Sequence, residues 1–344
     1  MAHYDGVFNA LGLREWCDSA GSDGPMTMAQ LLARAQGTDE GATTGPLPFP
    51  SLDSLHEACS KIPQTREMTA GLERFFLDIK DNLKVVLDPI TQPLSWMLDG
   101  ALWLFTSVPW WILIPLLIAL CWYVSRSKPV TVFVVIAFAF LGAIDHLEVA
   151  IQTLSIIFVC TGLCVLFGVP IGIAMSKSDR LQKSGIPVLD LLQTLPTFVY
   201  LIPLIFLFSV TESKLYGIAI ILYAIVPVIR LTDLGIRLVD QDVIEAANAF
   251  GMNSRQKLFK VEIPLALPNI MAGVNQTIMM SLAMVVIASL VSAPGLGVLV
   301  LRGIRNLEIG VGLIAGLGIV LLAVILDRVS KAALARVDVS RSSR

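Results

Sequence analysis

Seven runs of apolar residues, separated by short polar stretches, dominate the chain from about residue 103 onward. Most of the runs are long enough to cross the roughly 30 Å hydrocarbon core of a bilayer as a helix. The pattern therefore predicts an all-α polytopic membrane protein with about seven transmembrane helices, and not a large soluble protein with an apolar core. The runs lie at about 103–124, 129–145, 149–175, 188–209, 215–236, 268–291 and 308–326, of which the second is the shortest.

A different pattern precedes the first run. Between residues 66 and 88, apolar residues recur at three- and four-residue spacing with charges on the other face, which predicts an amphipathic helix. Such a helix can lie in the membrane interface or pack on the membrane-spanning body, and the pattern fits both. Residues 1–65 are rich in Gly, Ser, Thr, Pro and acids without sustained periodicity, so we expect a weakly ordered arm. The arm lacks the basic and apolar regions of a leader, and we expect it to be retained.

The composition agrees with a membrane location. Of the 344 residues, 55% are hydrophobic and 15% are charged, and the mean hydropathy is +0.76. The net charge of −2 is unevenly spread, since residues 1–101 hold 14 of the 27 acidic and 7 of the 25 basic residues. The other basic residues fall in short loops and not on one polar face, so the charge gives no support for nucleic-acid binding.

These basic residues sort the loops by side, because short loops rich in Lys and Arg remain in the cytoplasm. They concentrate after the first, third, fifth and seventh runs, whereas the intervening loops carry only Lys214, Arg302 and Arg305. The distribution predicts an extracytoplasmic N-terminal arm and a cytoplasmic C-terminus. The basic residues after the odd-numbered runs are Arg126, Lys128, Lys177, Arg180, Lys183, Arg237, Arg255, Lys257, Lys260, Arg328, Lys331, Arg336, Arg341 and Arg344.

The polar stretch between the fifth and sixth runs is about 30 residues long, too long for a simple turn. Its early acidic residues, the helix formers from Glu245 onward and Gly251 as a stop predict a short helix over 241–252 with a glycine C-cap. The small side chains of Ala246 and Ala247 leave one face of this helix nearly bare. Such a face suits insertion into a groove on another protein.

The spacing in this stretch resembles the signature of permease subunits of bacterial ATP-binding-cassette (ABC) importers. Glu245-Ala246-Ala247 is followed after three residues by Gly251, and after nine more by Val261-Glu262-Ile263-Pro264. Val261 and Ile263 stand where the family pattern usually has Ile and Leu. The resemblance implies that 241–252 is a coupling helix that docks on the ATPase, whereas the alternative is an incidental amphipathic loop helix. The implied coupling residues are Glu245, Ala246, Ala247, Gly251 and Pro264.

The resemblance covers about residues 85–335 and is closest to the permeases for glycine betaine, proline betaine, choline and related amines. It implies a five-helix type I ABC importer core over 147–326 in a bacterial inner membrane, two flanking helices over 103–145 and a basic tail over 327–344. It also implies that selectivity rests largely with a separate binding protein, so trimethylamine N-oxide stays open as a substrate. The passages that carry the resemblance are 193–203, 270–277, 284–289, 294–297 and 325–328.

An energy source is missing from the chain, because no Gly-x-x-x-x-Gly-Lys-Ser/Thr phosphate-binding loop occurs in the sequence. We therefore expect no enzymatic activity and no cofactor here, with ATP and magnesium bound by a separate ABC ATPase dimer. One copy presents one coupling helix, so a homodimer of permeases on two ATPases is the economical assembly. The other expected partners are a periplasmic or lipid-anchored substrate-binding protein and membrane lipid.

A gradient-driven secondary transporter of small solutes is the alternative function. Such proteins usually bury acids or histidines as relays in the middle of the membrane. Here Asp190, Arg230 and Asp233 lie near the cytoplasmic ends of their runs, where snorkelling or pairing explains them. A membrane enzyme would need a cluster of nucleophile, base or metal ligands, and the cysteines and histidines form no metal-binding pattern.

The five cysteines fit structural roles. Cys160 and Cys164 share a helix face, as small packing residues do. Cys17 and Cys59 lie outside the apolar region and could form one disulfide if the arm is extracytoplasmic.

Uncharged polar residues inside the runs are candidates for the translocation pathway, because amide and hydroxyl dipoles let a zwitterion pass without trapping it. The alternative for them is hydrogen bonding between helices. Tyr200 and Tyr223 could face a quaternary ammonium group, although belt and packing roles also stay open. Pro196 and Pro203 break the fourth run, and broken helices often border a transport route. The candidate pathway residues are Gln193, Thr194, Pro196, Tyr200, Asn275 and Gln276, beside which Thr277 is also polar.

Overall fold

The structure of the chain is a computed structural model, which describes residues 11–12 and 65–337. Every regular element among these residues is a helix, as the apolar runs predict. The chain divides into two compact units, Met1–Asp81 and Asn82–Arg344, and the packing described below is that of the second. The predicted arm lies outside the described residues apart from residues 11–12, and so do Cys17 and Cys59.

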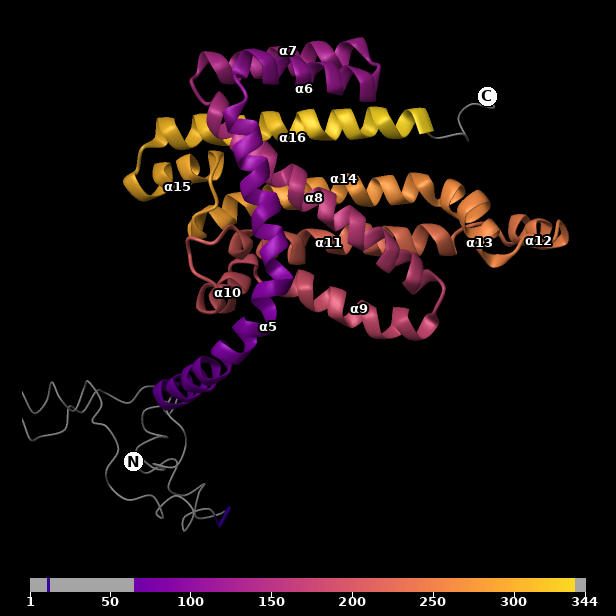
Figure 1. Cartoon of the computed structure of the whole chain (residues 1–344), viewed down its shortest axis with the longest axis horizontal. Helices are drawn as coiled ribbons and strands as arrows, with labels where there is room; N and C mark the ends of the chain where they lie inside the picture. Colours follow the sequence, from indigo (N-terminus) through magenta and orange to yellow (C-terminus); the bar gives the residue numbers. More distant parts are fainter. Residues whose placement is uncertain (1–10, 13–64, 338–344) are drawn as a thin grey trace, which may run out of the picture. The chain divides into compact units, whose positions relative to one another are not determined.

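The first helices are α5 (Thr65–Ser107), α6 (Trp110–Ser125) and α7 (Lys128–Ala143). The amphipathic helix predicted over 66–88 therefore does not end at residue 88 but continues to Ser107. The first run, predicted as one helix over 103–124, is divided at Pro109, the N-cap of α6. Proline cannot donate a backbone hydrogen bond and keeps the residue before it extended, which explains the division. Helices α6 and α7 pack side by side (Figure 1).

The third run forms one helix, α8 (Leu147–Ser176), but the fourth run is broken. Helix α9 (Asp179–Thr194) is followed by the 3₁₀ turn η1 (Thr197–Tyr200) and by α10 (Leu201–Leu207), with a bend of 103° between the two parts. The predicted interruption at Pro196 is thus confirmed. Pro203 does not interrupt α10, because it stands in the first turn, where its missing N–H has no partner within the helix.

The remaining long helices follow the predicted runs closely, except at the end of the chain, whereas the helix over Leu296–Asn306 lies between two runs and was not predicted. The last helix continues past residue 326 into the segment predicted as a basic tail. An ion pair of 2.9 Å between Lys331 and Asp327, one turn apart, supports these additional turns. These elements are α11 (Ser213–Arg237), α12 (Gln241–Ala249), α13 (Ser254–Lys257), the π-helical turn η2 (Leu258–Glu262), α14 (Ile263–Ala288), the 3₁₀ turn η3 (Ser289–Val291), α15 (Leu296–Asn306) and α16 (Ile309–Val337).

Helices α8, α11 and α14 form the core of the second unit, with α11 packed against both of the others (Figure 1). The backbones approach closely at glycines. A Cβ atom added to Gly172 of α8 would lie 2.7 Å from the carbonyl oxygen of Ile229, and one added to Gly273 of α14 would lie 3.0 Å from the Cα atom of Val228. Small residues at such crossings are typical of helices packed within a membrane.

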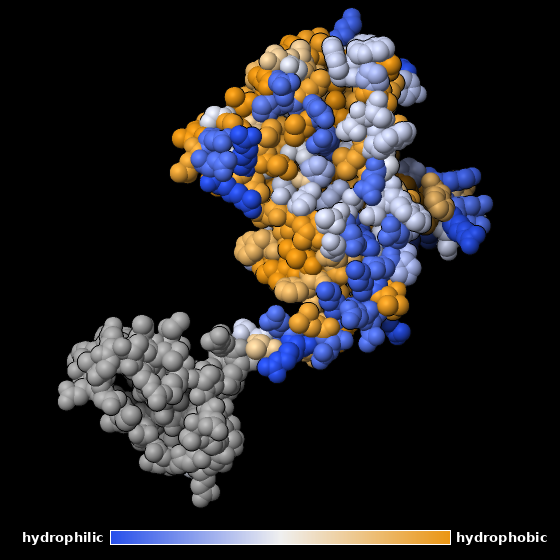
Figure 2. Space-filling view, turned by 60° about the vertical axis from the view of Figure 1, so that its left-hand side comes forward, coloured by the Kyte–Doolittle hydropathy of each residue, from blue (hydrophilic) through white to orange (hydrophobic). Residues whose placement is uncertain are grey.

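Four helices of the described part of the chain are long and apolar enough to cross a membrane, or up to six if each bent pair is one span. Helix α7, with 16 residues, is shorter, so the number of seven stays a prediction. Large apolar residues such as Trp103, Phe158 and Leu313 are 66–70% exposed. Figure 2 shows broad hydrophobic areas on the visible surface, which suit contact with lipid.

Candidate functional site

The candidate site is the segment of residues 240–264 between α11 and α14, here called the coupling segment. Its first helix, α12, begins where the sequence predicts. The Asp240 carboxylate caps it by accepting a hydrogen bond of 2.9 Å from the Asp242 N–H. Helix α12 ends at Ala249 and not at residue 252 as predicted, because Gly251 has φ +73°, in the left-handed region that favours glycine. The predicted glycine C-cap is confirmed, with the Gly251 N–H donating to the Asn248 carbonyl at 2.9 Å.

One face of α12 is open. Val243, Ala246 and Phe250 follow one another at three- and four-residue spacing and are all exposed, and the Phe250 ring is 84% exposed. Glu245 beside them is exposed as well, whereas Ala247 is buried against the rest of the chain. The two alanines therefore point to different sides, and only Ala246 belongs to the bare face. Figure 1 shows α12 and α13 lying beyond the ends of α11 and α14, where another protein can reach them.

The rest of the coupling segment is tied back to the chain. Asn253 and Gln256 form a reciprocal capping box at the start of α13, and Lys257 donates a 3.1 Å hydrogen bond to Asn248 of α12. Glu262, at the end of η2, is only 4% exposed and forms an ion pair with Lys177 at the end of α8. Pro264 stands exposed in the first turn of α14, where proline is tolerated.

A second ionic cluster lies at the same ends of the helices. The nearly buried carboxylate of Asp233 accepts hydrogen bonds from Arg237, at 3.0 Å, and from Gln182, at 2.7 Å. Arg237 also reaches Asp179 at 2.8 Å and the carbonyl oxygen of Met175 at 2.9 Å. The cluster joins the end of α11 to the turn between α8 and α9.

Pairing accounts for the ionisable residues that the sequence places within the apolar runs. Arg230 forms an ion pair with Asp190, and Asp233 is held by Arg237. These residues therefore behave as the pairing interpretation predicts. The Lys177–Glu262 pair was missed, because Lys177 has the appearance of a loop charge in the sequence; the acid beside Ile263-Pro264 was the one available signal.

The candidate pathway residues fall into two groups. Gln193 and Thr194 end α9 next to the break at Pro196, and the Gln193 amide lies 3.7 Å from the sulfur of Met280 in α14. The hydroxyl of Tyr200, beyond the break, donates to the carbonyl oxygen of Leu192. The break is therefore folded back onto α9 and faces α14.

The second group lies on α14. Asn275 donates a 3.0 Å hydrogen bond to Asp327 of α16 and accepts one of 2.6 Å from Ser330. The neighbouring Gln276 is exposed. Asn275 thus makes the interhelical hydrogen bonds that were its alternative interpretation.

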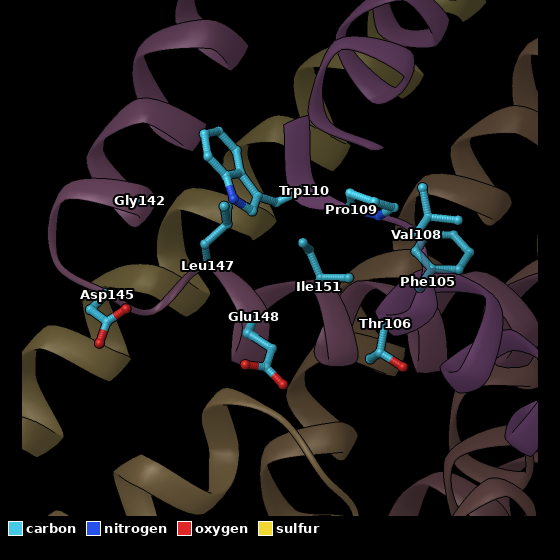
Figure 3. A pocket seen from close by; sticks show the side chains of 10 residues that line it. All are labelled: Phe105, Thr106, Val108, Pro109, Trp110, Gly142, Asp145, Leu147, Glu148 and Ile151. Atoms are coloured by element: carbon cyan, nitrogen blue, oxygen red, sulfur yellow. The ribbon is translucent and has the colours of Figure 1, made fainter. Parts of the chain in front are cut away.

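A cavity of about 560 Å³ lies away from all six, between the α5–α6 connection and the α7–α8 connection (Figure 3). The rings of Phe105 and Trp110 and the carboxylates of Asp145 and Glu148 are among the groups that line it. Asp145 has φ +57°, a conformation that Asp tolerates better than most side chains.

Comparisons with known proteins agree with one another. Residues 165–339 match the family described as binding-protein-dependent transport system inner membrane component. The chain is 39% identical over 285 residues to the glycine betaine/proline betaine transport system permease protein ProW of Escherichia coli (strain K12), covering 83% of this chain and 78% of ProW. It is 38% identical over 258 residues to the glycine betaine transport system permease protein OpuAB of Bacillus subtilis (strain 168), covering 75% of this chain and 89% of OpuAB.

The fold has a counterpart among solved structures. A chain of the inward-facing MetNI methionine ABC transporter superposes with a TM-score of 0.51 at 19% sequence identity. The match covers 56% of this chain and 95% of that chain. At this identity the likeness concerns the fold alone.

Proposed function

The chain belongs to the family of binding-protein-dependent transport system inner membrane components, and from this premise we propose that it carries glycine betaine or a related methylated amine into the bacterial cell. It is a multi-pass permease subunit of an ABC importer that works with an ATPase and a substrate-binding protein. The relatives named for glycine betaine and proline betaine support the substrate class. Choline, proline betaine and trimethylamine N-oxide are the competing substrates.

The observation that carries the coupling role is the open face of α12. Within the Glu-Ala-Ala motif, Glu245 and Ala246 face outward, and Gly251 keeps the helix end free of a side chain. A small residue beside an exposed ring allows close approach by the walls of a partner groove. Ala247 is buried, so its role in coupling is to position the helix, whereas Pro264 is exposed in the first turn of α14.

The assembly that follows is a homodimer of this chain on two ATPase subunits, with a substrate-binding protein on the opposite side of the membrane. ATP and magnesium are bound by the ATPase, since the sequence has no phosphate-binding loop of its own. The Lys and Arg distribution supports a cytoplasmic coupling segment and C-terminus. A reporter active only in the cytoplasm, fused after Arg344, should be active, and one fused near Pro46 should be silent.

Uptake by the reconstituted complex tests the function. The chain is placed in liposomes with its ATPase and binding protein, and uptake of radiolabelled glycine betaine is measured with ATP inside. We expect ATP-dependent uptake, inhibited by an excess of the amine that the binding protein prefers. Absence of uptake for all four amines would overturn the substrate proposal. ATP turnover by the purified chain alone, with contaminating ATPase excluded, would overturn the proposal that a separate subunit hydrolyses ATP.

A further inference from the structure

The chain is bound on both sides of α12 and α13 to one short stretch, the turn between α8 and α9. On the N-terminal side, Arg237 lies three residues before Asp240 and binds Asp179 at 2.8 Å and the Met175 carbonyl at 2.9 Å. On the C-terminal side, Glu262 forms its ion pair with Lys177. Residues 175–179, here called the α8–α9 joint, therefore bind Glu262 inside the segment and Arg237 just before it.

The ion pair is buried on its Glu262 side only. The Glu262 side chain is 5% exposed, while that of Lys177 is 44% exposed. Removing one partner leaves a buried charge uncompensated, which is far more costly than losing an exposed surface pair. We therefore expect Glu262 and Lys177 to stay paired when the segment is displaced.

The joint leads directly to the broken span. Helix α9 starts at Asp179 inside the joint and ends at Thr194, next to the interruption at Pro196. Gln182, one turn into α9, is bound to Asp233 of α11, which keeps the start of α9 in register with α11. A movement of the joint is thus delivered along α9 to the region where Gln193 faces α14.

We propose that the α8–α9 joint transmits the displacement of the coupling segment to α8 and α9, with Lys177 and Glu262 as positioning residues. This inference rests on the proposed coupling role of α12. Apolar packing alone would allow the segment to slide over the helix ends, whereas an ion pair within it at Glu262 and another just before it at Arg237 fix the direction of the movement. A residue that only supports the fold would lower the amount of active complex but not the substrate moved per ATP hydrolysed.

The test uses Lys177→Gln, Lys177→Glu, Glu262→Lys and the swapped double variant in the complete reconstituted complex. Uptake of radiolabelled glycine betaine and ATP hydrolysis are measured side by side, and their ratio is the readout. We expect each charge reversal to lower the ratio about tenfold or more, as suits a broken buried pair. We expect the milder Lys177→Gln to lower it about threefold or more, and the swapped pair to restore it to within about threefold of wild type.

Lys183→Glu is the matched control. It makes the same charge change on the solvent-exposed part of α9, and the described residues give it no ion pair. It should keep the wild-type ratio. The joint is refuted if Lys177→Gln keeps the wild-type ratio, or if the swapped pair is as uncoupled as the single reversals. A wild-type complex that shows no ATP-driven uptake of any methylated amine would instead refute the proposed function.

Discussion

Polar and small residues are exposed in the coupling segment and closely packed in the helical core. In the coupling segment, Glu245 and Ala246 face outward, and a Cβ atom added to Gly251 would meet nothing within 4 Å. In the core, a Cβ atom on Gly172 would clash with the backbone of α11, and the Thr161 hydroxyl is hydrogen-bonded to Ser281 of α14 at 3.2 Å. The open face of α12 leaves room for the partner proposed above, whereas these core residues already contact one another.

This contrast separates two reasons for which a residue can matter. A substitution in the core should lower the stability of the isolated chain, because the substituted residue already contacts its neighbours there. A substitution on the open face of α12 should leave the isolated chain unchanged and affect only the assembled transporter. Each of the following changes tests one side of the contrast.

The largest effect is expected from Glu245→Lys. Reversing this exposed charge should cost about 1–3 kcal/mol of docking free energy, roughly 5- to 150-fold in affinity for the ATPase. We expect uptake to be abolished and ATPase activity to lose its dependence on substrate, while membrane insertion and substrate binding to the soluble receptor persist. Glu148→Lys, also exposed and at the other end of α8 from the joint, is the control. Wild-type coupling in Glu245→Lys would show that α12 does not link ATP hydrolysis to transport.

Two substitutions at Gly251 separate the cost of backbone strain from the effect of a clash with the partner protein. Alanine and leucine pay a similar cost at φ +73°, about 1 kcal/mol, so Gly251→Ala and Gly251→Leu should destabilise the isolated chain alike. Only leucine fills the open space beside the helix end, and we expect it to abolish uptake, whereas alanine should retain most of it. Equal uptake by the two variants, measured in the reconstituted complex, would mean that no partner approaches this position.

Local motifs allowed the coupling helix to be predicted from the sequence. Asp240 as a cap, the alanines and Gly251 lie within a dozen residues, and each acts through its own backbone, so the start of the helix and its glycine C-cap follow without knowledge of the rest of the fold. The joint is a different case. Lys177 and Glu262 are 85 residues apart, and nothing in a single sequence indicates which of several loop charges meet.

Helix ends within the apolar runs were also difficult to predict. Hydropathy averages over a window, so it merged the residues on both sides of Pro109 into one run, although proline divides them. Conversely, α5 passes through Pro89 and Pro93, where the periodicity appeared to end. The three-helix core of α8, α11 and α14 agreed with the runs because each of these helices is long and unbroken, although α11 passes through Pro227.

Gly172→Ala tests the close packing of α8 against α11 in the core. The added methyl group would lie 2.6 Å from the Cβ atom of Thr232, so α8 and α11 must move apart, at a cost of about 1–3 kcal/mol. Gly162→Ala in the same helix has no neighbour within 4 Å and should be neutral or slightly stabilising, by up to about 1 kcal/mol. Thermal unfolding of the purified chain in detergent measures both. A Gly172→Ala protein as stable as Gly162→Ala would contradict the close packing.

The smallest effects are expected from Asn275→Leu and Gln276→Leu, neighbours on α14 that fall on opposite sides of the same contrast. Asn275 is bound to Asp327 and Ser330 of α16, so leucine there removes two interhelical hydrogen bonds and should lower the stability of the isolated chain by about 1 kcal/mol. Gln276 is exposed, so leucine should leave stability unchanged, and a fall in uptake would then place its amide on the translocation pathway. Thermal unfolding and uptake are measured for both variants, because only the combination distinguishes packing from passage. If Asn275→Leu keeps its stability but loses uptake, the hydrogen bonds to α16 are not what makes Asn275 important, and its amide would have to serve the passing substrate instead.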